Sequence, residues 1–380
     1  MMPMTRTGES SAIGPLLLAF ELSERTWKLG FSAGLETRLW RRQVDAGAVE
    51  RLVAEIARAK AHVRLPAATP VVSCYEAGRD GFGLHRCLAQ HGVTNYVVDS
   101  SSIEVKRRAR RAKSDGLDLL GLLGLLTRDC RGESRVWHVV RVPSVADEDA
   151  RHLHRLRESL QQERTRVINR VHGLLATQGI RLPLHRRWRD QLATATCGDG
   201  TPVPPGLRQR LDAVGAQLQF LDAQLADVDA ARAALPVDEG TETGRCVQQL
   251  QRLHGIGASG AWTLATEIFG WRHIQHRREL GALVGVVPAP YQSGLIAHDQ
   301  GITRAGNRHV RRMIVQLAWS WLRYQPTSAL SRWYRARFGD GRRARRIGIV
   351  ALARKLLIAW WQYLKTGTPP TDATLKSHVA

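Results

Sequence analysis

Three short apolar runs near the start of the sequence constrain its fold more than any other feature. They cover Leu16–Leu22, Trp27–Phe31 and Thr37–Arg41, with brief breaks between them. Such runs are typical of consecutive strands in a meander. Ala48–Ala61 follows with its apolar side chains on one helical face, which predicts a helix. Residues 1–14 are predicted to be a loose leader.

The next segment alternates strands with helices. Pro70–Tyr75 and Tyr96–Asp99 predict buried strands, and Asp80–His91 between them predicts a helix. A basic helix over Ile103–Arg111 and an apolar helix over Leu117–Arg128 are expected to follow. The order β-β-β-α-β-α-β-α is that of a ribonuclease-H-like (RuvC-type) α/β fold, in which helices flank a mixed sheet.

The charge balance points to a polyanionic partner. The 380 residues include 56 Lys and Arg against 34 Asp and Glu, which gives a net charge of +22. A positive excess of this size is a solubility liability unless an anionic partner neutralises it. Nucleic acid is the default partner for such a chain.

Cysteine usage and hydropathy narrow the class further. The five cysteines include no CxxC pair and are odd in number, so neither a zinc module nor a disulfide framework is expected. The apolar runs Leu119–Leu126 and Ile347–Trp361 are short or interrupted by charge, so no membrane span is expected. We therefore expect a cytoplasmic, nucleoid-associated protein with no membrane partner.

Two long helices are predicted in the middle of the chain. Val145–Thr177 repeats apolar residues every seven positions, and Leu207–Val228 steps by four and three. This spacing is a heptad seam. Two interpretations stay open: the helices pack on each other as an antiparallel hairpin, or they form an arm for oligomerisation. A Pro-containing break over Gly179–Pro205 separates them.

From Gln248 the chain is predicted to be mainly helical. Its first expected parts are a Gly-rich turn (His254–Gly257) and an apolar helix (Ala261–Phe269), which together resemble a helix-hairpin-helix. An irregular stretch (Val286–Gly301) and basic helices over Asn307–Tyr324 and Ala329–Tyr363 follow, the second broken near Gly339–Gly341. The predicted domains are a leader (1–14), the α/β metal domain (15–143), a helical coiled-coil segment (144–247) and a helical C-terminal domain (248–380).

Four acidic residues fall where the predicted fold would gather them. Glu21 and Glu76 end the first and fourth predicted strands, and Asp115 and Asp118 share one face at the start of a helix. Carboxylates from several elements suit Mg²⁺, with Mn²⁺ as a substitute, and two such ions can catalyse phosphodiester chemistry. Singly, each residue is more often a solvated strand edge or a compensator of the helix dipole. Their order within a basic chain favours the metal site.

Basic residues form three runs that could neutralise phosphates, and the third run begins with Arg332, Arg335 and Arg337. The Gly-rich turn adds Gly255 and Gly257, which could admit a phosphate to backbone N–H groups, or could simply join two packed helices. Among the aromatic residues beside the runs, Trp333 and Tyr334 could stack on bases, whereas Trp319 and Trp321 are predicted to pack in the core. The candidate contacts are Lys106, Arg107, Arg108, Arg110, Arg111 and Lys113, then Arg304, Asn307, Arg308, Arg311 and Arg312, then Arg342, Arg343, Arg345 and Arg346.

The sequence resembles the insertion-sequence one-ten family of transposases, the DEDD class of bridge-RNA-guided recombinases. The resemblance covers roughly residues 16 to 361 and rests on three segments: Glu76-Ala77-Gly78, Lys113-Ser114-Asp115 with Asp118, and Tyr291-Gln292-Ser293-Gly294. The family typically has Asp as its first carboxylate, where this chain has Glu21 followed by Leu22-Ser23. Residue types alone would make Ser293 a turn serine.

The resemblance implies a serine transposase domain in the C-terminal part of the chain. Ser293 would attack a DNA phosphate and hold a transient phosphoserine link, and the carboxylate-bound Mg²⁺ ions would support that reaction. It also implies a structured guide RNA that pairs with donor and target DNA, while protein reads backbone and shape. A homo-oligomer of two to four copies is implied, with the metal and serine domains of one site not necessarily from one protomer.

Two other functions remain open on the sequence. A Holliday-junction-type, structure-selective nuclease would share the carboxylate set and use water as its nucleophile, but the roughly two hundred residues after the metal domain count against it. A decayed element product that only binds nucleic acid is the non-enzymatic alternative, and the Glu21 departure keeps it open.

Overall fold

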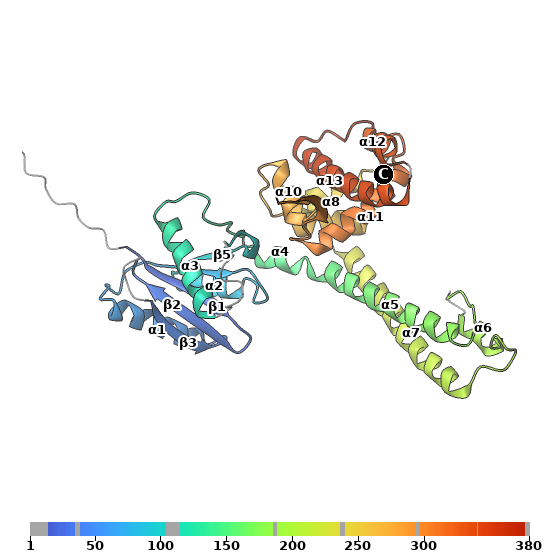
Figure 1. Ribbon diagram of the computed structural model, residues 1–380, viewed down its shortest axis with the longest axis horizontal. Coiled ribbons are helices and arrows are strands. Elements are labelled where there is room, and N and C mark those ends of the chain that lie inside the picture. Colours follow the sequence, from blue (N-terminus) through green and yellow to red (C-terminus); the bar gives the residue numbers. More distant parts are fainter. Residues whose placement is uncertain are drawn as a thin grey trace, which may run out of the picture. The chain divides into compact units, whose positions relative to one another are not determined.

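The computed structural model describes residues 14–34, 39–103, 115–184, 188–235, 240–293, 296–339 and 341–376 (Figure 1). Within these ranges the side chains of residues 101, 115–117 and 291–299 are outside the description. The chain forms two compact units, Met1–Val142 and Pro143–Ala380. The predicted division into a leader and three domains stays a prediction.

A five-stranded mixed sheet organises the first unit. Its strands are β1 (Leu16–Leu22), β2 (Thr26–Ser32), β3 (Trp40–Asp45), β4 (Val71–Glu76) and β5 (Thr94–Val98), in the order β3-β2-β1-β4-β5. The β1–β2 and β2–β3 pairs are antiparallel, whereas β4 runs parallel to both β1 and β5. The five strands are confirmed. The third lies further along the chain than the predicted Thr37–Arg41, because its ladder with β2 begins at Trp40.

Helices cover both faces of this sheet. One face packs Leu18 and Phe20 against α1 (Val49–His62) and α2 (Gly83–Gln90). The opposite face packs Leu17 and Ala19 against α3 (Asp115–Cys130). A short 3₁₀ turn, Ser100–Ser102, follows β5. The alternation of neighbouring β1 residues between two cores is the signature of a strand buried on both sides. The predicted basic helix over Ile103–Arg111 falls almost wholly outside the described residues.

The second unit begins with a long helical hairpin. The predicted single helix over Val145–Thr177 is instead two helices, α4 (Val145–Asp149), whose N-terminus the Ser144 side chain caps, and α5 (His152–Ala176). The predicted break contains an unforeseen helix, α6 (Trp188–Thr194). The second seam lies on α7 (Pro205–Ala234).

Helices α5 and α7 pack side by side through the predicted seam, whose buried residues form one apolar cluster. Arg157 lies 2.7 Å from Asp229 and Arg164 lies 2.5 Å from Asp222, so ascending numbers on α5 meet descending numbers on α7. The helices are therefore antiparallel, which confirms the hairpin interpretation of the seam. An oligomerisation role stays a prediction.

The remaining chain folds around one core that includes Leu264, Trp321 and Trp360. The predicted helix over Ala261–Phe269 starts earlier and ends in a π-helical turn, and the stretch expected to be irregular forms a β-hairpin. The break near Gly339–Gly341 is confirmed. The elements are α8 (Glu242–Gln251), α9 (Ala258–Leu264), the π-turn (Ala265–Phe269), α10 (Arg277–Val284), β6 (Pro288–Ser293), β7 (Ile296–Ile302), α11 (Arg308–Tyr324), α12 (Ala329–Phe338) and α13 (Arg342–Thr366).

Helix α13 is long and apolar enough to cross a membrane by length and composition. However, Leu352, Leu356 and Trp360 on this helix are fully buried in the core. The central helix of a folded domain has a similar length and apolar composition. All five cysteines are free thiols.

The α5–α7 seam provides a stability test on two neighbouring residues. Leu221 is 4% exposed in the seam, whereas Phe220 is 62% exposed on the other side of α7. Leu221→Ala should lower the free energy of unfolding by about 2–5 kcal/mol, because it leaves a cavity in the packed hairpin. Phe220→Ala should cost less than about 1 kcal/mol. Chemical denaturation followed by circular dichroism measures both, and equal losses would contradict the packing.

Candidate functional site

Two of the predicted metal ligands meet at one edge of the sheet. The parallel register pairs Phe20 of β1 with Tyr75 of β4, so Glu21 and Glu76, one residue further on, lie at neighbouring strand ends. Neighbouring strands are roughly 5 Å apart. Both carboxylates project from the face that α3 covers, because Ala19 and Cys74, two residues earlier in each strand, pack in the α3 core.

The other two carboxylates belong to α3 itself. Asp115 is its first residue, and its side chain is outside the described residues. Asp118 is half-buried, one residue before Leu119, which is anchored in the α3 core. Among the described side chains, no group of three or more His, Cys, Asp or Glu is arranged to hold a metal ion. The adjacent pair Glu21 and Glu76 still fits Mg²⁺, which proteins often hold with one or two carboxylates while phosphate oxygens and water complete the shell.

The Cys74 thiol, two residues before Glu76 on β4, is fully buried. Burial raises its pKa well above the ordinary range, with smaller contributions from Cys130 and Asp129. A buried thiol with a raised pKa is an unreactive, structural cysteine.

Ser293 is the last residue of β6, and its strand partner is Ile296 of β7. The base of this hairpin is clamped to the end of α10. The Thr303 N–H donates to the Val287 carbonyl at 2.9 Å, and the Asn307 N–H donates to the Leu283 carbonyl at 2.8 Å. The serine thus lies at the end of the hairpin away from this hydrogen-bonded base. Its side chain is outside the described residues.

Two glycines make this clamp possible. Gly285 and Gly306 have φ angles of 69° and 99°, in the left-handed region that favours glycine. A Cβ atom at Gly285 would overlap the Ala305 carbonyl, and one at Gly306 would overlap the Leu283 carbonyl. The chain can pass this closely on both sides of the hairpin only because neither residue has a side chain.

A buried carboxylate, Glu267 on the π-turn, supports the same region. It accepts hydrogen bonds from Arg155 (2.7 and 3.0 Å), from His154 Nε2 (2.8 Å) and from Asn307 Nδ2 (2.7 Å). Burial alone would raise the pKa of Glu267, but the hydrogen bonds from His154 and Arg155 outweigh it and hold the pKa far below its ordinary value. Asn307 also caps α11 through its side-chain oxygen, so Glu267 joins α5, the π-turn and the start of α11.

The second basic run serves the fold more than was predicted. Arg312 forms an ion pair with Glu158 of α5 at 3.0 Å, and His309 also contacts Glu158. Arg311 donates to the Val284 carbonyl at 2.9 Å. Arg304 and Arg308 are exposed. Nucleic-acid contacts by these residues stay predictions.

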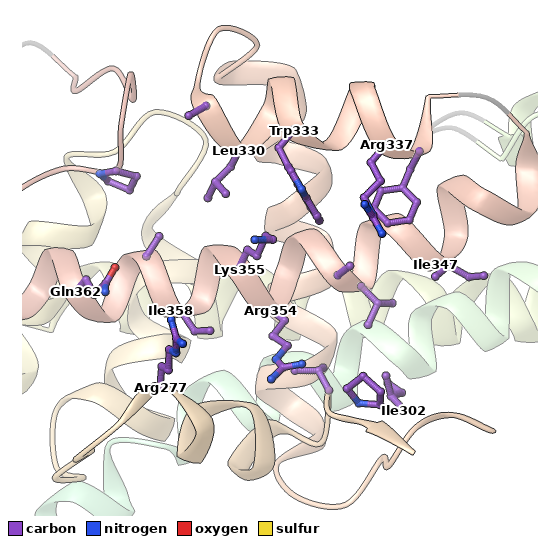
Figure 2. Close-up of a pocket in the computed structure, with 18 of the residues that line it drawn as sticks. Arg277, Ile302, Leu330, Trp333, Arg337, Ile347, Arg354, Lys355, Ile358 and Gln362 are labelled. Carbon is purple, nitrogen blue, oxygen red and sulfur yellow. The ribbon is translucent and has the colours of Figure 1, made fainter. Parts of the chain in front are cut away.

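A large cavity of about 1390 Å³ lies between α10, α12, α13 and the hairpin base, and we call it the cationic groove (Figure 2). None of its lining residues, all from the described part of the chain, is acidic. Apolar side chains also line it, among them Leu330, Val350 and Ile358. Its eight cations are Arg277, Arg278, Arg304, Arg337, Arg343, Arg346, Arg354 and Lys355.

Only part of the groove was foreseen from the sequence. Arg304, Arg343 and Arg346 line it, whereas Arg342 and Arg345 are exposed on α13 outside its lining. Arg337, which belongs to the third predicted basic run, lines it as well. Arg277 and Arg278 were not predicted, and Arg354 and Lys355 were interpreted only as interruptions of an apolar run. A signal was present, because lining positions on α13 recur every three or four residues (343, 346, 350, 354, 358 and 362) along one helical face.

The aromatic predictions divide. Trp321 is fully buried, as expected, but Trp319 is 45% exposed, so its predicted core position is wrong. Trp319 lies two residues from Trp321 on α11, on the helix face turned from the core. Trp333 is half-buried and lines the groove, whereas Tyr334 is 5% exposed in the core.

The Gly-rich turn is packed into the second unit. Gly255 has a φ of 87°, and its carbonyl accepts from Ser320 at 2.7 Å. The Ile256 carbonyl accepts from Lys376 at 2.8 Å. Gly257 precedes the first residue of α9. These contacts give the turn a structural role between packed helices, and phosphate binding by Gly255 and Gly257 stays a prediction.

Comparisons with known proteins agree with one another. A family model described as the transposase IS116/IS110/IS902 family matches residues 247–332. The chain is 38% identical over 380 residues, with 96% of each chain covered, to a Sinorhizobium fredii protein that bears the name transposase y4rJ. It is 28% identical over 243 residues, 63% of this chain and 70% of the other, to the transposase for insertion sequence element IS1328 of Yersinia enterocolitica. The transposase for insertion sequence element IS1111A of Coxiella burnetii is 25% identical over 228 residues, 59% of this chain and 61% of the other.

The Glu267 network predicts a pH-dependent stability. Glu267→Gln should lower the free energy of unfolding by about 3–5 kcal/mol at pH 7, because it removes the charge that compensates buried donors. The folded pKa of Glu267 is lowered, so its contribution is complete above the unfolded pKa of about 4.3 and declines as the pH falls below it. The difference between wild type and variant should therefore narrow from pH 5 to pH 3 in denaturant titrations.

The matched control is Glu242→Gln, which removes an exposed ion pair with Arg245 and should change stability little. Equal losses for the two variants at pH 7, or a gap that stays constant down to pH 3, would contradict the assigned role of Glu267.

Proposed function

The chain belongs to the IS116/IS110/IS902 family of transposases, and on that premise we propose that it exchanges DNA strands through a transient phosphoserine link at Ser293. Membership makes it the transposase of an insertion sequence, an enzyme that cleaves and recombines DNA. The observation that carries the serine proposal is the hairpin, which holds Ser293 at the end of β6 while the base of the same hairpin borders the cationic groove.

The proposed chemistry needs no net input of bond energy. The Ser293 Oγ attacks a phosphodiester phosphorus and releases its proton as the Oγ–P bond forms. The bond from phosphorus to one sugar oxygen breaks, and that oxygen takes up a proton. A hydroxyl group of another strand then attacks the phosphoserine, which frees Ser293 and leaves a new phosphodiester. One phosphodiester is thereby exchanged for another.

The first unit would be the metal domain of this reaction. The order of its elements and the mixed sheet support a ribonuclease-H-like fold. We propose that Glu21, Glu76, Asp115 and Asp118 hold Mg²⁺, two ions when complete, with Mn²⁺ as a substitute. Bound there, the metal would stabilise negative charge on the reacting phosphate and on the leaving oxygen. Support comes from the neighbouring strand ends of Glu21 and Glu76 and from the position of the two aspartates in the helix that covers their face.

The partners proposed are donor DNA, target DNA, a structured guide RNA and further copies of the chain. A net charge of +22 supports binding to more than one nucleic acid strand. Self-association to between two and four copies is proposed because the resemblance to the family implies it.

A covalent-adduct experiment tests Ser293. Protein incubated with Mg²⁺, guide RNA and labelled DNA should yield a protein–DNA species that survives denaturing electrophoresis, and Ser293→Ala should abolish it while DNA binding persists. Thr303→Ala is the matched control, because it removes an exposed hydroxyl group just beyond the other end of the hairpin and should leave the adduct intact. An adduct that persists in Ser293→Ala would remove the serine from the mechanism, and metal-dependent cutting of branched DNA without any adduct would favour the nuclease alternative.

A strand-exchange assay tests the carboxylates and the RNA. Purified protein, the RNA encoded beside the element, donor DNA and target DNA should give exchanged product only when RNA and Mg²⁺ are both present. Glu76→Gln should lower the rate by about 100-fold or more, because a metal ligand is lost, and calorimetry should show weaker Mn²⁺ binding. Glu24→Gln removes an exposed carboxylate three residues beyond Glu21 and should retain full exchange. Product formed without RNA would refute the guidance proposal and leave the serine chemistry standing.

A further inference from the structure

We infer that the cationic groove binds an unpaired stretch of the DNA strand being cut, with a base stacked on Trp333 and the phosphates held by the surrounding arginines. This inference rests on the proposed function, because it takes the strand attacked by Ser293 as the occupant. It adds a specific binding site, a strandedness and a recognition residue that the serine chemistry alone does not provide.

The charge of the groove calls for a polyanion. Eight cationic side chains line it without an acidic one, and none of the eight forms an ion pair with an acidic residue in the described part of the chain. Elsewhere in the second unit the arginines are often paired, as Arg157, Arg164 and Arg312 are. Uncompensated like charges repel one another, so a ligand that brings several phosphates stabilises this arrangement.

The apolar part of the lining distinguishes an unpaired strand from a duplex. On α13, Val350 and Ala351 lie between Arg346 and Arg354 along the helix, and Leu330 and Ile358 add further apolar surface. A duplex offers mainly phosphates to a surface of this kind, because its base faces are stacked inside the helix. An unpaired strand exposes those faces, and alternating apolar and cationic contacts are what single-strand binding sites use.

Trp333 is the one tryptophan of the groove and is held as a firm platform. Its ring meets the Phe338 ring edge to face at 5.6 Å, and Lys355 Nζ lies 4.6 Å from its centroid. Figure 2 shows the Trp333 side chain reaching from α12 toward Lys355 of α13. A lysine side chain is flexible, so an entering base can take the place of the ammonium over the ring, and the ammonium can then pair with a neighbouring phosphate.

The hairpin selects the strand. Pro288 of β6 and Gly301 and Ile302 of β7 form part of the groove lining, and Ser293 ends the same β6 strand five residues beyond Pro288. A strand seated in the groove therefore borders the hairpin that carries the proposed nucleophile. This continuity favours the DNA strand under attack over the guide RNA as the occupant.

The test is equilibrium binding by fluorescence anisotropy, in EDTA and at fixed salt, with a single-stranded DNA of mixed sequence and its duplex. Trp333→Ala should weaken single-strand binding on the order of 10- to 100-fold, as expected for one lost base stack, and change duplex binding less than about twofold. Trp333→Phe should restore much of the loss, since a phenyl ring still stacks. Trp361→Ala is the matched control, because Trp361 is also half-buried against the core with Lys365 Nζ 5.7 Å from its ring, yet it lies outside the groove lining.

The outcomes separate this inference from the proposed function. Equal weakening by Trp333→Ala and Trp361→Ala, or equal weakening of single-strand and duplex binding, would overturn the groove assignment while leaving adduct formation at Ser293 untouched. A single-stranded RNA of the same sequence is measured as well. If Trp333→Ala weakens its binding more than that of the DNA, DNA is overturned as the occupant. If the adduct persists in Ser293→Ala while Trp333→Ala still weakens single-strand binding selectively, only the serine chemistry is refuted.

Discussion

The buried Glu267 carboxylate is the constraint on which the second unit depends. A buried charge must be fully compensated, and three side chains from two other segments do so: Arg155 and His154 of α5, and Asn307 at the start of α11. These donors cannot shift without leaving the carboxylate unpaired. Asn307 directly follows the β6–β7 hairpin and its glycine clamp. The same buried carboxylate therefore holds both α5 and the segment that carries Ser293.

Much of the fold could be predicted because its elements carry their own patterns. β1 was predicted to the residue, since its apolar run ends where Glu21-Leu22 reach the edge of the sheet. The apolar seam of α7 could also be predicted, because a helix that packs along its whole length must repeat apolar residues at the period of the helix. The β6–β7 hairpin was missed. Pro288, Pro290 and Gly294 normally indicate a loop, and the prolines are tolerated here because this two-stranded sheet has free edges.

The candidate sites also differ in how far they could be predicted from the sequence. Glu21 and Glu76 could be brought together from sequence, because the ends of neighbouring parallel strands must meet. The cationic groove could not, since α10, α12, α13 and the hairpin each contribute a few residues, and their proximity is a result of tertiary packing. One local contact illustrates this: a Cβ at Gly348 of α13 would overlap the Phe338 ring of α12, so the approach of these two helices depends on a missing side chain that no charge pattern reveals.

The basic residues have two different roles, which the sequence alone does not distinguish: some form ion pairs within the fold, and others line the groove. Arg155, Arg157 and Arg312 are committed to carboxylates inside the second unit, where they hold helices together. Such residues add to the net charge but are already neutralised, so they release no counterions from a nucleic acid. The arginines of the groove have no such partner among the described residues, and a polyanionic ligand would relieve their repulsion. The salt dependence of nucleic-acid binding should therefore follow the uncommitted cations and not the total count of Lys and Arg.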